Sequence, residues 1–264
     1  MLMDYHVHTA LCGHAVGQLE DYIQAAARMG LRELGFNDHA PMFKARDPEL
    51  TMAPEQLPEY VERVRALQEK HSQPRIKLGI EADFVPGHEE QLRRLLGQYQ
   101  FDYVYGSVHI IGDWRFDDSR LYPEGYEERD RDEAYHEYFS LIRLSARSGL
   151  FDVLGHLDLI KKFDYWPRGE IGHLLEETVQ AIAAADVCVE VNTSGLRRPC
   201  AEIYPGKKIL QLCHRYGVPI TLGSDAHSPK EVGMDFDKAV KLLRDVGYTQ
   251  VATFSGRVRE LVDL

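Results

Sequence analysis

Short apolar runs alternate with longer amphipathic stretches along the whole chain, and this alternation constrains the fold more than any other feature. The apolar runs predict strands at residues 4–7, 33–36, 77–80, 103–107, 153–155, 188–191 and 219–222. The stretches between and after them predict helices at 19–29, 55–70, 88–98, 126–147, 172–185, 207–216 and 235–246. Repeated strand–helix units of this kind build a parallel sheet or a barrel. A last apolar stretch, 250–254, is expected to close or cover that barrel.

The helix boundaries carry the residues that helix ends favour. Pro54 stands just before the second helical stretch, where its fixed φ suits the first turn, and Gly30 follows the first stretch. We find no internal repeat, no low-complexity tract and no Ser/Pro/Gly-rich linker in the 264 residues. Barrels of this length are commonly one domain, so a single domain over residues 1–264 is expected.

Histidines gather where the predicted strands end. Of the twelve histidines, five lie in helical stretches, and the remainder fall at or just beyond the C-terminal ends of strands: His6, His8, His14, His39, His109, His156 and His227. Barrel enzymes build their active sites from these strand ends and the loops that follow them. The placement therefore indicates a functional site at one rim of the barrel.

The spacing of these histidines is that of metal ligands. His6 and His8 are two residues apart on a strand, so both imidazoles point to the same side, and Asp225 and His227 repeat the spacing after the last strand. Glu81 ends the third strand, where its two oxygens can bridge neighbouring ions. A single pair of this kind is more often packed or hydrogen-bonded than metal-bound. So many imidazoles and carboxylates at one rim, however, need partners, and divalent metals satisfy both groups.

The motifs and their order resemble the polymerase and histidinol phosphatase (PHP) family. They are HxH (His6, His8), CGH (Cys12 to His14), NDH (Asn37 to His39), EAD (Glu81 to Asp83), GSVH (Gly106 to His109), GH (Gly155, His156) and SDAH (Ser224 to His227). Each motif is weak alone, but in this order they run through nearly the whole chain. The segments 155–163 and 192–199 resemble the histidinol-phosphatase branch in particular.

This resemblance implies a fold, an activity and a ligand set. The fold is an α/β, TIM-barrel-like, distorted (β/α)7 barrel. The activity is hydrolysis of L-histidinol phosphate to L-histidinol and phosphate in histidine biosynthesis, with two or three divalent ions of zinc, iron or manganese. The implied ligands are His6, His8, Glu81 and Asp225 for one ion, Glu81, His109 and His156 for a second, and His14, His39 and His227 for a third.

Further residues suit the chemistry of a phosphate ester. Arg197 is predicted to make paired hydrogen bonds to the phosphate, with Lys161 as the next basic group. Asp38, beside His39, is predicted either to orient a ligand imidazole or to shuttle a proton to the leaving group. The charged segment 112–133 is predicted to be either a lid or a solvated face. If it is a lid, its residues, including Trp114, would recognise the cationic part of the substrate.

Composition limits the partners. The formal net charge of −11 opposes attraction to nucleic acid or to an anionic membrane. The expected partner is the small phosphate ester that the family resemblance implies. We see no signal peptide and no membrane span, and the four cysteines show no regular disulfide framework; these features predict a cytoplasmic protein. The sequence does not indicate the oligomeric state.

Three alternatives remain open on the sequence alone. A PHP phosphoesterase acting on a nucleotide or on phosphotyrosine would have the same metal ligands and a different pocket. An amidohydrolase-like barrel also begins with HxH and ends with an aspartate, but its bridging lysine on strand four is missing here. The third alternative is a barrel that binds metal and has lost turnover.

Overall fold

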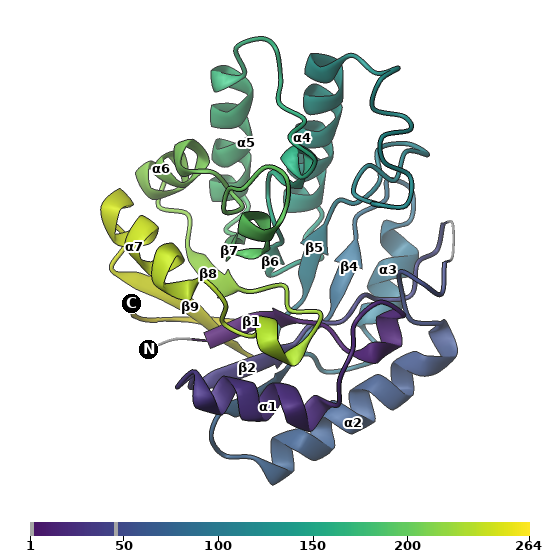
Figure 1. Ribbon diagram of the computed structural model, residues 1–264, viewed down its shortest axis with the longest axis vertical. Coiled ribbons are helices and arrows are strands. Elements are labelled where there is room, and N and C mark those ends of the chain that lie inside the picture. The colour runs from purple at the N-terminus through teal and green to yellow at the C-terminus, as the bar shows by residue number, and fades with distance from the viewer. Residues whose placement is uncertain (1–2, 45–46) are drawn as a thin grey trace.

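Parallel strands form the centre of the computed structural model, which describes residues 3–44 and 47–264 (Figure 1). One parallel sheet holds β1 (Met3–Val7), β2 (Glu33–Phe36) and β3 (Arg75–Leu78). The other holds β4 (Glu81–Asp83), β5 (Tyr105–Ser107), β6 (Val153–Leu154), β7 (Cys188–Asn192) and β8 (Ile220–Gly223). The strands occur in chain order in each sheet, as sequential βα units require.

The two sheets join into a distorted barrel. A parallel bridge between Val7 and Ala226 connects the end of β1 to the segment after β8, and a second bridge pairs His39 with Glu81. Only Gly79 and Ile80 separate β3 from β4, so these two act as one interrupted strand. Counted this way, β1 to β8 give the seven parallel strands of the predicted distorted (β/α)7 barrel, and that fold class is confirmed.

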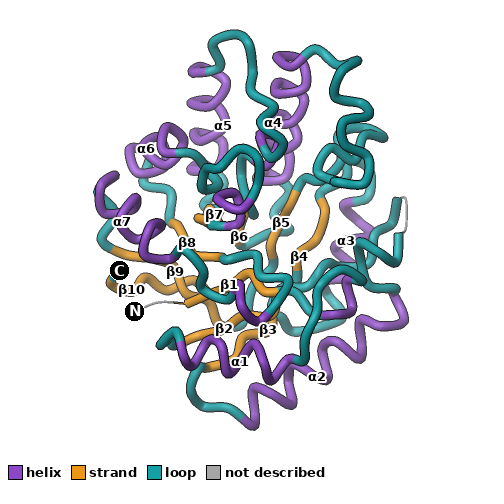
Figure 2. Tube along the Cα trace, viewed as in Figure 1, coloured by secondary structure: helices purple, strands orange, loops and turns teal. Residues whose placement is uncertain are grey.

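Helices surround the strands (Figure 2). They are α1 (Leu19–Arg28), α2 (Leu57–Lys70), α3 (Glu89–Leu96), α4 (Arg131–Arg147), α5 (Gly172–Ala184), α6 (Lys207–Arg215) and α7 (Phe236–Val246). Each buries an apolar stripe at helical spacing; in α1, for example, Leu19, Tyr22, Ile23 and Ala26 are buried. Short 3-10 turns follow several strands, including η1 (Ala10–Cys12), η3 (Leu159–Lys161) and η4 (Ser194–Arg197).

The end of the barrel opposite the histidines is filled with aromatic side chains. The rings of Tyr5 and Tyr103 stack at 4.8 Å, and Phe254 packs against both. Phe254 belongs to β9 (Gln250–Ser255), which pairs antiparallel with β10 (Val258–Asp263). The predicted apolar stretch 250–254 is thus part of strand β9, and its Phe254 side chain packs against Tyr5 and Tyr103 of the barrel. Within the described ranges, no helix is both long enough and apolar enough to cross a bilayer.

One predicted boundary was wrong, and the reason is a helix cap. The stretch 126–147 is helical only from Arg131, because the Asp130 carboxylate accepts hydrogen bonds from the backbone N–H groups of Asp132 and Glu133 and starts α4 there. Residues 112–130 form turns before it. Trp114 in this segment is 7% exposed, and its ring packs edge-on against Tyr126 at 4.8 Å.

Candidate metal centre

Four predicted ligands converge from β1, from β4 and from the segment after β8. The Nε2 atoms of His6 and His8, both on β1 or directly after it, lie 3.9 and 3.2 Å from Oδ1 of Asp225. The same nitrogens lie 3.2 and 3.7 Å from Oε2 of Glu81. Asp225 adopts the left-handed region with φ of 55°, an uncommon conformation for a residue other than glycine that is often found at functional sites. These four side chains surround one point at the rim.

A second group forms around the other oxygen of Glu81. Its Oε1 lies 3.0 Å from Nε2 of His156 and 3.7 Å from Nε2 of His109, and it accepts a hydrogen bond from Ser107 at 2.6 Å. Because Oε2 faces the first group and Oε1 the second, the carboxylate lies between them. The two oxygens of Glu81 are therefore placed as the predicted bridging role requires, and that role stays a prediction.

The remaining histidines lie close to both groups. Nε2 of His14 and Nε2 of His227 are 2.9 Å apart, and the ligand atoms of His14, His39 and His227 lie within 4.8 Å of one another. His39 also places Nδ1 3.1 Å from Oε2 of Glu81, so it lies between this third group and the carboxylate. The structure therefore brings all the predicted metal ligands together; their assignment to particular ions stays a prediction.

The donor set fits divalent cations. Ring nitrogens face one another in two pairs, His14 with His227 and His109 with His156, and the His109–His156 distance is 3.3 Å. Two imidazole lone pairs at such separations need a proton or a cation between them. In addition, Nε2 of His8 is buried with no hydrogen-bond partner. A bound cation would satisfy each of these groups.

Burial and neighbouring charges together set the pKa values of the side chains in the cluster. Burial lowers the pKa of His6, but neighbouring carboxylates, Glu190 first among them, outweigh it and hold the pKa well above its ordinary value. Burial likewise raises the pKa of Glu81, yet the imidazoles of His6 and His39 lower it well below its usual range. Burial also lowers the pKa of His227 well below its ordinary value, with His8 adding to the effect. The carboxylates thus stay ionised and attract cations.

Each of three ligand imidazoles has a carboxylate behind it: Glu190 behind His6, Asp38 behind His8 and Asp83 behind His109. Asp38 Oδ1 lies 3.5 Å from His8 Nδ1, while its Oδ2 accepts from the hydroxyl and backbone N–H of Thr9. Asp83 Oδ1 lies 2.8 Å from His109 Nδ1. Such contacts fix the orientation of a metal-binding imidazole. Asp38 is fully buried, and these contacts favour the first of its two predicted roles, orientation of a ligand.

Two of these carboxylates escaped the sequence reasoning. No role was predicted for Asp83 of the EAD motif or for Glu190, which contacts His6. Glu190 did carry a signal, because it is an acidic residue inside the apolar strand 188–191. A charged residue at such a position needs a buried partner, which the sequence alone does not identify.

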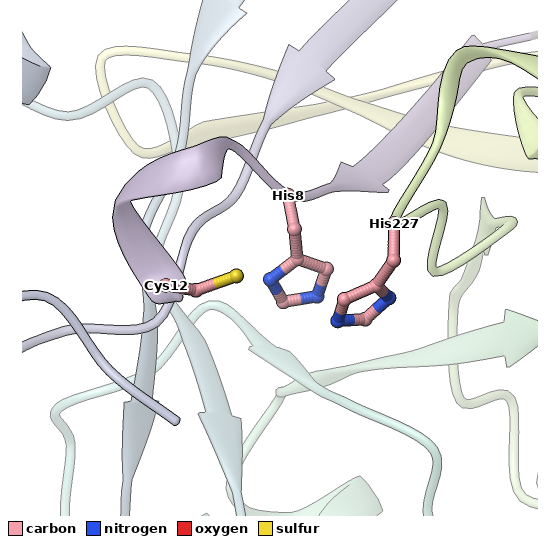
Figure 3. Close-up of side chains that lie close together, drawn as sticks. All are labelled: His8, Cys12 and His227. Atoms are coloured by element: carbon pink, nitrogen blue, oxygen red, sulfur yellow. The ribbon is translucent and has the colours of Figure 1, made fainter. Parts of the chain in front are cut away.

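Cys12 lies on the far side of His8 from His227. Figure 3 shows its side chain pointing toward the His8 ring, and the His8 and His227 rings stack with centroids 4.1 Å apart. The three side chains are close enough to share a cation. However, burial raises the pKa of the Cys12 thiol, and the Asp38 carboxylate raises it further. Without a metal the Cys12 thiol is therefore neutral, and it packs beside the His8 ring as a small apolar side chain. All four cysteines are free and buried.

The two predicted phosphate-binding residues have protein partners. Arg197 donates to the carbonyl of Ser224 at 2.6 Å, and its Nη1 is buried without a partner. Lys161 is 1% exposed and lies 2.8 Å from Asp158 and 2.5 Å from Glu202. Neither lines the cavity at the rim, whereas their neighbours Arg198 and Lys162 do. The roles of Arg197 and Lys161 stay predictions.

A cavity of about 600 Å³ opens over the histidine cluster. Its floor includes His39, Glu81, His109 and His156, and its wall carries side chains of both signs. The basic ones include Arg120, Lys162 and Arg198, and the acidic ones include Glu49, Asp117 and Glu231. Trp114 is not among the lining residues, since its ring packs against Phe116 and Tyr126 of the same segment.

A distorted α/β barrel with a dense cluster of imidazoles and carboxylates at its C-terminal rim defines the class of metal-dependent hydrolase barrels. Comparison with known proteins narrows this class. The model of the PHP domain matches residues 4–194, and the model described as PHP-associated matches residues 207–234. The chain belongs to the PHP family.

Several relatives of this chain are named histidinol-phosphatase or probable histidinol-phosphatase. It is 46% identical to a probable histidinol-phosphatase of Deinococcus radiodurans, over 93% of this chain and 94% of the relative. It is 30% identical to a probable histidinol-phosphatase of Schizosaccharomyces pombe, over 95% and 89%. Among solved structures, the Lactococcus lactis histidinol phosphate phosphatase in complex with zinc, L-histidinol and phosphate matches with a TM-score of 0.85 and 26% identity, covering 98% of both chains.

Proposed function

We propose that this chain is a metal-dependent phosphomonoesterase that hydrolyses L-histidinol phosphate to L-histidinol and phosphate, a step of histidine biosynthesis. One observation carries the proposal: Glu81 lies between two groups of imidazoles on the floor of an open cavity, with a third group beside them. The relatives named histidinol-phosphatase support the same substrate along nearly the full length of the chain.

The proposed metal assignment follows the three groups. His6, His8, Glu81 and Asp225 would hold one ion, Glu81, His109 and His156 a second, and His14, His39 and His227 a third. Divalent ions at these positions would lower the pKa of an attacking water and neutralise charge on the phosphate. Zinc is the ion present in the solved L. lactis relative, and iron and manganese suit the same donors.

The protein's own side chains would orient the substrate. The basic groups on the wall, Lys162 and Arg198, can donate to phosphate oxygens, and a guanidinium can do so with two parallel hydrogen bonds. The acidic groups Asp117 and Glu231 offer acceptors for a cationic amine. A cavity with both signs of charge fits a small substrate that has a phosphate at one end and an amine at the other.

A substrate panel on one metal-analysed sample tests this function. We expect phosphate release from L-histidinol phosphate to exceed release from nucleotides and from phosphotyrosine by at least about 100-fold in kcat/KM, since a pocket that pairs buried polar groups discriminates strongly against substrates that leave them unpaired. Steady-state phosphate assays at matched enzyme and metal concentrations give the comparison. Equal or higher rates on a nucleotide or on phosphotyrosine would overturn the substrate assignment and leave the phosphoesterase class intact.

The ion held by the third group is expected to bind least tightly and to contribute least to turnover. Its members include no carboxylate, and His14 is exposed, with Nδ1 3.0 Å from the backbone carbonyls of Cys12 and Glu49. His14→Ala is therefore expected to lose one ion and to lower kcat by about 100-fold, a loss typical of removing one charge-stabilising group. Metal content and kcat are measured on the same sample. His88, a half-buried histidine at the start of α3 and outside the cluster, provides the control: His88→Ala should change neither value.

The cytoplasmic location and the single domain over residues 1–264 stay predictions. Four free, buried thiols support a reducing compartment for this proposed biosynthetic enzyme. A small phosphate ester remains the proposed partner in place of nucleic acid or a membrane.

A further inference from the structure

Glu190 is a buried carboxylate whose contacts are divided between two directions. It lies in the middle of β7 and is 0% exposed. Its Oε1 is 2.6 Å from Nδ1 of His6. Its Oε2 accepts from the backbone N–H of His156 at 2.8 Å and from the side-chain amide of Asn192 at 3.0 Å. One side of the carboxylate therefore faces an imidazole of the cluster, and the other side is occupied by two fixed donors.

The contact with His6 decides which nitrogen of that ring can bind a metal. An ionised carboxylate only accepts hydrogen bonds, so Nδ1 of His6 must carry the hydrogen that points at Glu190. In the neutral ring, Nε2 then keeps its lone pair, and Nε2 is the atom that lies 3.2 Å from Glu81. We propose that Glu190 is a positioning residue that holds His6 in the Nδ1–H tautomer and presents its Nε2 to the metal. This inference deepens the proposed function and rests on the assignment of His6 as a ligand.

The neighbouring strand leaves space for this contact. Gly223, at the end of β8, has no side chain, and a Cβ there would lie 1.9 Å from Oε1 of Glu190 and 2.7 Å from Cβ of His6. Both distances are far too short for ordinary contacts. Any larger residue at position 223 would push the carboxylate and the imidazole apart. Three strands, β1, β7 and β8, therefore meet around the Glu190–His6 pair.

The substitution Glu190→Gln tests the proposal because the glutamine side chain has one oxygen that accepts and one NH₂ group that donates hydrogen bonds. His156 N–H and the Asn192 amide both point at the Oε2 side, so the glutamine oxygen must take that side. Its NH₂ group would then face His6 and donate to Nδ1. Nδ1 becomes the acceptor, the hydrogen moves to Nε2, and the nitrogen nearest Glu81 can no longer bind a cation.

The experiment measures zinc affinity by competition with a chromophoric chelator, together with the side-chain ¹⁵N spectra of the histidines. We expect Glu190→Gln to bind zinc about 10- to 100-fold more weakly at the position that includes His6, the usual loss when the partner of a ligand imidazole is removed. Its His6 signals should show the hydrogen on Nε2. Gly223→Ala, which keeps the carboxylate and displaces it, should weaken zinc binding in the same direction.

Tyr105→Phe is the matched control. The Tyr105 ring lies edge-on to His6 at 5.1 Å, and its hydroxyl is buried without a hydrogen-bond partner, so its removal disturbs the same region without touching Nδ1. It should keep wild-type zinc affinity. Unchanged zinc affinity and an unchanged His6 tautomer in folded Glu190→Gln would overturn the proposal.

The His6 spectrum of the wild-type protein tests the proposal even if the variants do not fold. In the zinc-loaded protein the His6 spectrum should show a hydrogen on Nδ1 and metal on Nε2; metal on Nδ1 would overturn the proposal. Failure of the proposed function looks different. In that case zinc binding and the His6 spectrum stay as expected while the loaded wild-type protein releases no phosphate from L-histidinol phosphate.

Discussion

Glu81→Gln is expected to lower kcat/KM for L-histidinol phosphate by at least about 1000-fold, equivalent to about 4 kcal/mol of transition-state stabilisation. The carboxylate is 1% exposed, and its two oxygens face different imidazole groups. Glutamine keeps the shape but removes the charge, and its NH₂ would point at ring nitrogens that are meant to face a cation. Two ions would lose their shared ligand, so both metal content and phosphate release should fall. Elemental analysis and a steady-state phosphate assay on the same preparation check this.

Glu33→Gln is the control for Glu81→Gln. Glu33 is also a buried carboxylate of the barrel, 2% exposed, but it starts β2 and pairs with Arg75 and the Tyr5 hydroxyl, away from the rim. Its substitution should lower thermal stability and leave metal content and kcat close to wild type. If Glu81→Gln kept full metal content and more than a tenth of the activity, the bridging role of Glu81 would be wrong.

The sequence predicted the barrel well because hydrophobic periodicity is a local signal. Strand 33–36 coincides with β2, and the other strands are placed within a few residues of those observed. Hydrophobic periodicity did not show where a hydrogen bond starts a helix or where a strand is interrupted. Asp130 starts α4 later than expected, and the Gly79–Ile80 break divides the third strand. Both depend on hydrogen bonds that apolar patterning does not encode.

The metal cluster was predictable for a different reason. The C-terminal ends of parallel strands meet at one rim, so His6, His109 and Asp225 converge although they are far apart in the sequence. The residues behind the ligands were harder to find, because the importance of Glu190 depends on a partner that lies 184 positions away. Side-chain direction was harder still. At the ends of the 3-10 turns η3 and η4 the sequence predicted Lys161 and Arg197 as phosphate-binding residues, whereas their neighbours Lys162 and Arg198 line the cavity.

Removing the metal is expected to abolish phosphate release and to change how stability depends on pH. In the metal-free cluster, burial lowers the pKa of His8, but the nearby carboxylates of Asp225 and Asp38 outweigh it and raise the pKa to about 9. Burial is also outweighed at His109, where Asp83 and other carboxylates raise the pKa to about 10. Protonated imidazoles then occupy the place of cations among ionised carboxylates. Activity should return when zinc is added back.

The pH dependence of the metal-free protein follows from these shifts. The unfolded chain releases the His8 and His109 protons near the ordinary value of 6.5, so their contribution to stability is complete below pH 6.5 and is lost as pH rises toward 9 to 10. His39 and His227 have lowered pKa values, chiefly because of burial, so they destabilise the folded state below pH 6.5 and have no effect above it. The free energy of unfolding of the metal-free protein should therefore be highest near pH 6.5.

Zinc should oppose the loss of stability that is expected above pH 6.5. A metal competes with protons for the same ring nitrogens, so it binds more tightly as the protons are removed. Between pH 6.5 and 9 the melting temperature of the chelated protein should fall, while the difference between zinc-loaded and chelated protein widens. Circular dichroism melts at matched free zinc across this range measure both quantities. His173, an exposed histidine on α5, allows a control substitution to Gln that should leave both curves unchanged. A metal-free protein that becomes more stable from pH 6.5 to 9 would contradict the charge arrangement described for the cluster, because the raised pKa values of His8 and His109 require the opposite slope.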